Sequence, residues 1–175
     1  MAVQDQWLRA SQHRFLFCKN LWQDLTKHYG NTDGKAYQRQ RPMRMAYQYA
    51  LLDHLLSAAK FLTQACLKQL ANTRFDDITL SSWQQIEAVL AAQDYLSPEA
   101  GRIHSLIKQG DWATWIELQG QTDFSVASKQ DEAFDQLISL SEENDVSDPD
   151  HWPIERWLKQ YEALQSDVIA SMAEY

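Results

Sequence analysis

The sequence predicts an all-α protein, a helical bundle of five to seven helices that opens with a long antiparallel αα-hairpin. Apolar residues recur every three or four positions along most of the chain, which is the period of an α-helix. Capping and stop signals also bound several short helices in its middle. No alternation of apolar and polar residues lasts long enough to build a sheet.

The first helix is predicted to cover about residues 4–29. Its apolar side chains are spaced so that they share one helical face; they are Leu8, Phe15, Cys18, Trp22, Leu25 and Tyr29. The segment 30–34 contains two glycines and an asparagine, residues that tolerate turn conformations. We therefore expect the first helix to end there.

A second long helix is predicted to begin near Pro42, because proline is tolerated in a first turn, where its missing N–H would have no partner anyway. Its apolar stripe consists of Tyr47, Leu51, His54, Leu55, Ala58, Leu62, Ala65 and Leu70. A short connection between two long helices usually returns the second one antiparallel to the first, which predicts the hairpin.

A third helix is predicted from a capping box, in which Ser81 or Ser82 is followed three residues later by Gln84 or Gln85. Its apolar side is formed by Trp83, Ile86, Val89 and Leu90.

Two more short helices follow. Ser97 and Pro98 are typical of a helix start, and Gly110 is expected to close that helix. Asp111 is then expected to cap a brief helix that ends at Gly120.

The acidity of the chain is concentrated in residues 123–150, which hold nine of its 24 acidic and one of its 16 basic residues. This segment accounts for the net charge of -8, and the rest of the chain is balanced. Within the predicted acidic loop or tether at about 121–150, residues 134–141 fit either a short helix or an extended segment. Residues 142–150 predict a loop.

A final helix is predicted at about 153–174, with Pro153 in its first turn. Its apolar seam consists of Ile154, Trp157, Leu158, Tyr161, Leu164, Val168 and Met172. A seam of this length suits packing onto the same chain or onto a second copy in a homo-oligomer.

Length and composition predict one domain spanning residues 1–175. The longest apolar run is five residues, 88–92, and no signal-peptide pattern opens the sequence, so we expect a cytoplasmic protein without a membrane span. Cys18 and Cys66 have apolar neighbours at helical spacing, which predicts buried free thiols. A pI near 5.0 argues against a general nucleic-acid binder.

The strongest local anomaly is a run of four basic residues, Lys35, Arg39, Arg41 and Arg44, without an acid among them. It falls in the expected loop and first turn of the second helix, where positive charge is unfavourable. These side chains either point into water or converge on an anion such as a phosphate or carboxylate. The chain's own acidic segment is one candidate anion.

The tryptophans divide into two groups. Trp22 and Trp157 fall in apolar stripes and are expected to be core residues. Trp7, near the start of the first predicted helix, and Trp152, just before the last one, are better candidates for an interface.

Other site types have less support. His54 lies within an apolar stripe, where it suits a hydrogen-bonded core residue or the polar group of a small-molecule pocket. Asp24 and His28 have the spacing of two metal ligands, but nothing nearby completes a set, so no metal is predicted. The sequence also lacks the arginine–histidine spacing of helical RNases and the motifs of hydrolases and of nucleotide cofactor sites. Neither a catalytic site nor a cofactor is predicted.

Segments 9–17, 50–58 and 96–99, followed by Asp111 and Trp112 and by an acidic loop before a tryptophan-containing last helix, resemble a family of small uncharacterised proteins of gammaproteobacteria, pseudomonads included. The resemblance implies a cytoplasmic helical domain, and it transfers no functional residue.

These observations predict a non-enzymatic interaction or regulatory module, in which the basic residues and the acidic segment bind each other or a protein partner. The alternative is binding of nucleic acid or another phosphate anion through residues 35–44.

Overall fold

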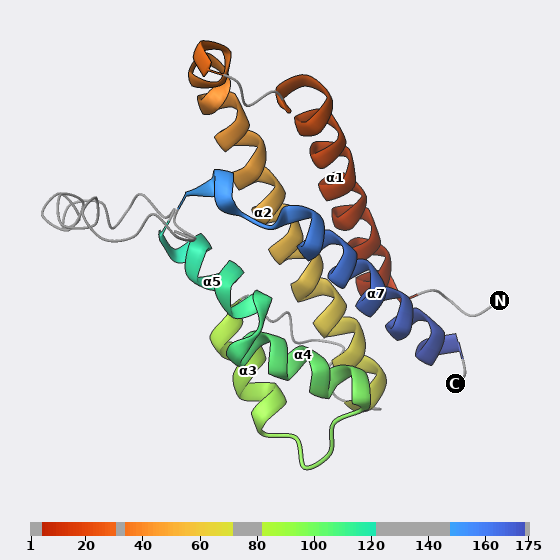
Figure 1. Cartoon of the computed structure of the whole chain (residues 1–175). Coiled ribbons are helices and arrows are strands. Elements are labelled where there is room, and N and C mark those ends of the chain that lie inside the picture. Colours follow the sequence, from red (N-terminus) through yellow and green to blue (C-terminus); the bar gives the residue numbers. More distant parts are fainter. Residues whose placement is uncertain (1–4, 31–33, 72–81, 122–147, 174–175) are drawn as a thin grey trace, which may run out of the picture.

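Helices make up almost all of the structure (Figure 1). A computed structural model describes residues 5–30, 34–71, 82–121 and 148–173, which form six α-helices and one short 3-10 helix and no strand. The predicted all-α class is confirmed for this part of the chain. None of the described helices carries an apolar stretch long enough to cross a bilayer.

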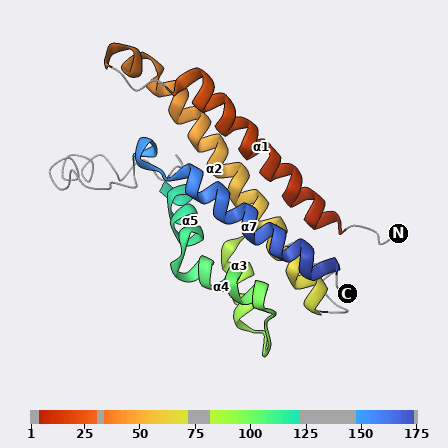
Figure 2. The same cartoon turned by 45° about the vertical axis from the view of Figure 1, so that its right-hand side comes forward.

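Helices α1 (Gln6–Tyr29) and α2 (Gly34–Ala71) run antiparallel, side by side, and form the predicted hairpin (Figures 1 and 2). The carboxylate of Asp5 caps α1, because its Oδ1 accepts hydrogen bonds from the backbone N–H groups of Trp7 at 2.7 Å and Leu8 at 3.2 Å. The buried side of α1 faces α2, where the thiol of Cys18 lies 3.6 Å from the carbonyl oxygen of Leu51.

Helix α2 begins at Gly34, so the prediction of a start near Pro42 is wrong. Gly34 has a φ of 56°, a left-handed conformation that glycine adopts without a steric penalty. Pro42 lies inside the helix, where it cannot donate the backbone hydrogen bond to the carbonyl of Gln38. The basic residues at 35–44 therefore lie on successive turns of a helix rather than in a loop.

Three short helices follow: α3 (Trp83–Ala91), α4 (Pro98–Gln109) and α5 (Asp111–Gln121). The predicted capping box is confirmed, since the side chain of Ser82 accepts from the N–H of Gln85 and the side chain of Gln85 accepts from the N–H of Ser82. Ser97 likewise caps α4 by accepting from the N–H of Ala100 at 3.2 Å.

Two glycines near α5 behave differently. Gly110 separates α4 from α5, and a Cβ there would lie 2.8 Å from the Cα of Leu106, so the close approach requires glycine. Gly120 lies inside α5, which continues to Gln121, so the predicted end at Gly120 is wrong. Glycine weakens a helix interior but does not stop it.

The C-terminal segment begins with the 3-10 helix η2 (Pro149–His151), where the sequence predicted a loop, and continues as α7 (Ile154–Ala173). Helix α7 lies between the hairpin and the group of short helices (Figures 1 and 2). Its seam is buried within this chain. The buried members are Ile154, Trp157, Leu158, Tyr161, Leu164 and Val168.

Aromatic side chains of α5 and α7 pack against one another in the core. Trp115 and Trp157 are each 1% exposed, and their ring centroids lie 5.7 Å apart in an edge-on contact. Trp112 stacks on Trp115 at 5.8 Å and on Tyr161 at 6.2 Å. The expected core role of Trp157 is confirmed.

Trp152 is also buried, so its prediction as an interface residue is wrong. Its ring contacts those of Tyr49 at 5.4 Å and Trp157 at 5.9 Å, which places it in the same aromatic cluster. Trp7 is half-buried and stacks on Phe61, and Trp22 is half-buried rather than fully enclosed.

One polar group of three side chains lies within this core. The Ser11 hydroxyl of α1 is 2.6 Å from the Tyr161 hydroxyl of α7, and the Gln165 amide donates to Ser11 Oγ at 3.0 Å. Burial raises the pKa of Tyr161 far above its ordinary value, so its hydroxyl stays protonated. The three side chains thereby join α1 to α7 without a charge.

The two cysteines are buried and free, as the sequence predicted. Burial raises the pKa of Cys18 and of Cys66 to about 12. Both are therefore neutral thiols, a form with little reactivity.

Candidate anion site on α2

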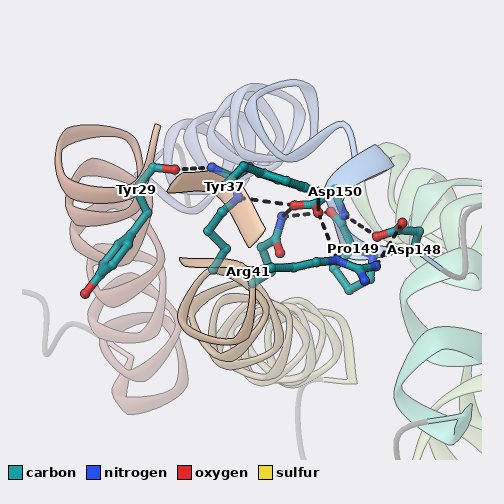
Figure 3. A network of polar contacts seen from close by, with 8 residues as sticks. Tyr29, Tyr37, Arg41, Asp148, Pro149 and Asp150 are labelled. Atoms are coloured by element: carbon teal, nitrogen blue, oxygen red, sulfur yellow. Dashed lines mark hydrogen bonds and ion pairs between the residues drawn. The ribbon is translucent and has the colours of Figure 1, made fainter. Parts of the chain in front are cut away.

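Four hydrogen-bond donors share one face of α2, because they follow one another at intervals of four, three and four residues. We call Tyr37, Arg41, Arg44 and Gln48 the donor stripe. All four contact the segment that precedes α7. Figure 3 shows Tyr37 and Arg41 beside this segment. We call this segment, Asp148, Pro149 and Asp150, the acidic clasp.

The carboxylate of Asp150 is the centre of the contact. Its Oδ1 accepts from Arg44 Nε at 3.3 Å and from Gln48 Nε2 at 3.5 Å. Its Oδ2 accepts from the Tyr37 hydroxyl and lies 3.6 Å from Arg41 Nε. Burial alone would raise the pKa of Asp150, but the hydrogen bonds from Tyr37 and Arg44 outweigh it and lower the pKa below its ordinary value. The clasp therefore binds as a carboxylate.

Asp148 lies at the rim of the site, with 29% of its side chain exposed against 11% for Asp150. Arg41 Nη2 donates to its Oδ2 at 3.3 Å, and its Oδ1 accepts the backbone N–H of Asp150 at 3.0 Å, which closes a tight turn. The Asp148 carboxylate raises the pKa of Arg41, whose side chain is 46% exposed.

The other end of the donor stripe is buried. Gln48 is 3% exposed and donates to the carbonyl of Pro149 at 2.8 Å. The side chain of Arg44 is 12% exposed, its Nη1 donates to the carbonyl of Tyr29, and its guanidinium lies 5.7 Å from the Tyr37 ring. Tyr29 is the last residue of α1, so Arg44 also satisfies a carbonyl that has no helical partner.

The structure divides the four predicted basic residues. It brings Arg41 and Arg44 together on the acidic clasp, whereas Lys35 and Arg39 are exposed and form no ion pair with another described residue. Arg39 precedes Arg41 by two positions, a rotation of about 200° around a helix. We call Lys35 and Arg39 the outer basic pair. Their lack of convergence with Arg41 and Arg44 follows from the helical conformation of residues 34–41.

Tyr37 and Gln48 were not predicted as site residues. Their spacing from Arg41 and Arg44 is a detectable signal, but only when residues 34–41 are assigned to the helix. Of the acidic segment 123–150, only residues 148–150 fall among the described residues. The alternatives for residues 134–141 lie outside them.

The second predicted site residue, His54, is half-buried between α1 and α2. Arg14 Nη1 lies 3.1 Å from its Nδ1, and the ring of Phe17, which is 48% exposed, lies 5.3 Å from its ring. Arginine can only donate, so His54 Nδ1 is the acceptor in this contact. His54 is thus a hydrogen-bonded residue beside an exposed phenylalanine.

No group of three or more potential metal ligands occurs among the described residues, which include Asp24 and His28. Comparisons of the chain with protein-family models, with curated proteins and with solved structures found no match. The resemblance to the gammaproteobacterial family stays a prediction.

Proposed function

We propose that this protein is a non-enzymatic interaction module whose binding surface is the donor stripe of α2. In this proposal the acidic clasp occupies the surface until a partner replaces it. The observation that carries the proposal is the pairing of Arg41 and Arg44 with the chain's own Asp148 and Asp150. Two guanidinium groups arranged on carboxylates form a site suited to binding anions.

The exposure of the site supports exchange rather than permanent closure. The ion pair at the rim, between Arg41 and Asp148, is partly open to water. Exposed ion pairs contribute at most about 1 kcal/mol to stability. The rim contact therefore opens at little cost, and exchange of the clasp begins there, before the nearly buried Asp150 is released.

The test is the double variant Asp148→Asn and Asp150→Asn, applied to a heparin column as a polyanion probe. We expect it to elute at higher salt than the wild type, because Arg41 and Arg44 lose their internal carboxylates. The matched control is Glu155→Gln with Asp167→Asn, which removes two surface carboxylates from α7 and changes the net charge equally. Elution of both double variants at the same salt concentration would contradict the proposal.

The exposure of the outer basic pair favours a second candidate, the binding of single-stranded RNA or another phosphate polymer by Lys35 and Arg39. Each phosphate neutralised on a single strand contributes about -0.7 to the slope of log affinity against log salt. A mobility-shift titration at two salt concentrations tests this candidate. The variant Lys35→Gln with Arg39→Gln should flatten the slope, and an unchanged slope would exclude the outer basic pair as the contact.

A further inference from the structure

We propose that the partner of the donor stripe is an acidic peptide turn in another protein, with two aspartates separated by one proline. This inference rests on the proposed function and adds the chemistry of the ligand. The acidic clasp is the guide, because it shows which groups the donor stripe holds and at which distances.

The deep part of the site is specific for one carboxylate. Tyr37, Arg44 and Gln48 donate to Asp150, and Arg41 forms an ion pair with it. These donors come from successive turns of one helix, so the backbone fixes the spacing of the residues that carry them. A partner must therefore place one carboxylate at the position of Asp150.

The Gln48 contact favours a peptide over a nucleic acid. Gln48 is nine-tenths buried or more and donates to the main-chain carbonyl of Pro149, a neutral acceptor beside the carboxylate. A peptide presents a carbonyl in this position at every residue, whereas a nucleic-acid backbone presents charged phosphates and sugars. Pro149 is itself buried, so the middle residue of the turn is also in contact with the protein.

The second carboxylate defines the spacing. Asp148 accepts hydrogen bonds from Arg41 and from the backbone N–H of Asp150. A partner's carboxylate two residues before the one that replaces Asp150 would therefore pair with Arg41 and close the same turn. Arg41 is the most exposed arginine of the donor stripe. A partner's turn therefore meets Arg41 first and replaces the clasp from the rim inward.

Competition with the clasp sets the measured affinity. A tethered ligand acts at an effective concentration of about millimolar, so the wild-type protein should bind a free peptide weakly. Removing the clasp removes this competitor. We expect the triple variant Asp148→Gly, Pro149→Gly and Asp150→Gly to bind such a peptide at least about tenfold more tightly than the wild type.

The experiment measures fluorescence anisotropy of a labelled peptide Ser-Asp-Pro-Asp-His, with Ser-Asn-Pro-Asn-His and a peptide with one glycine inserted between the aspartates as controls. The triple variant should bind the first peptide at least about tenfold more tightly than either control, because charge-assisted hydrogen bonds to the carboxylates are lost or displaced. Adding Arg41→Gln should weaken binding of the first peptide by about tenfold. Circular dichroism checks the helix content, and Asp148→Asn with Asp150→Asn replaces the triple variant if that variant does not fold.

A labelled single-stranded oligonucleotide and heparin form the second arm. Selective binding of the Asp-Pro-Asp peptide supports the inference. Equal binding of all three peptides, or binding of heparin or the oligonucleotide without the peptide, overturns it and leaves the proposed function standing. If a folded variant without the clasp carboxylates binds none of these probes, both this inference and the proposed function are overturned.

Discussion

Two of the contacts that hold residues 148–173 against the rest of the molecule have opposite chemistry. Helix α7 is held mainly by apolar burial, with Trp157, Tyr161 and Leu164 each at most 2% exposed. The acidic clasp is held by charged and polar groups near the surface, where Arg41 and Asp148 are partly open to water. Apolar burial is insensitive to moderate salt, whereas exposed ion pairs are screened by it. The structure thus combines an attachment by apolar burial with one by charged groups, and the proposed function requires only the second to exchange.

Other ion pairs of α7 resemble the rim of the clasp. Lys19 with Glu162 and Arg102 with Asp167 each have a separation of 2.5 Å but side chains that are about half exposed. Such pairs contribute little to stability, so the aromatic core carries most of the attachment of α7.

The largest expected effect is that of Trp157→Ala. Removing a buried tryptophan deletes apolar contacts and leaves a cavity, which should lower the free energy of unfolding by about 3–5 kcal/mol. Urea denaturation followed by circular dichroism measures it. Gln160→Ala, at an exposed position of the same helix, should change stability by at most about 0.5 kcal/mol. If the two variants were equally stable, the aromatic core would not be the main attachment.

The buried polar trio should have the next largest effect. Ser11→Ala removes the hydroxyl that both Tyr161 and Gln165 contact, and we expect a loss of about 2 kcal/mol. Tyr161→Phe leaves the Ser11–Gln165 hydrogen bond in place and should lose about 1 kcal/mol. Urea denaturation compares them with Ser166→Ala, an exposed serine of α7. A larger loss of stability for Tyr161→Phe than for Ser11→Ala would show that Ser11 does not connect the three side chains.

The sequence predicts the apolar contact better than the polar one, for a physical reason. The seam of α7 and the caps at Ser82 and Ser97 are local patterns, readable within a few residues. The clasp joins Arg41 to Asp148, 107 positions apart, and no local pattern specifies that pairing. The charge distribution did suggest a pairing of the basic residues with the acidic segment. It did not reveal which arginines take part, because this depends on the helical conformation of residues 34–41, which have no apolar stripe.

Within the clasp, Asp150→Asn should have the larger effect, about 2 kcal/mol at pH 7, because its carboxylate accepts several hydrogen bonds in a nearly buried position. The pKa of Asp150 is lower in the folded protein than its ordinary value of 3.8. Its contribution is therefore complete well above pH 3.8 and is lost as the pH falls through the folded-state pKa. Urea denaturation of the wild type and the variant from pH 7 downward should show the difference shrinking below about pH 4. If the difference in stability between the wild type and Asp150→Asn stayed constant down to pH 2, the charge of Asp150 would not be the source of its contribution.

The smallest effect should come from Asp148→Asn, at most about 1 kcal/mol, because a rim ion pair with a half-exposed arginine is well solvated. This small contribution should also be the most salt-sensitive, since the Debye length falls from about 10 Å at 0.1 M to about 3 Å at 1 M salt. Urea denaturation at these two salt concentrations should show the difference between Asp148→Asn and the wild type vanishing at high salt, while the difference for Trp157→Ala persists. A salt-resistant contribution of Asp148 as large as that of Asp150 would make the whole clasp a permanent attachment like α7, and exchange with a partner would then require release of the helix as well.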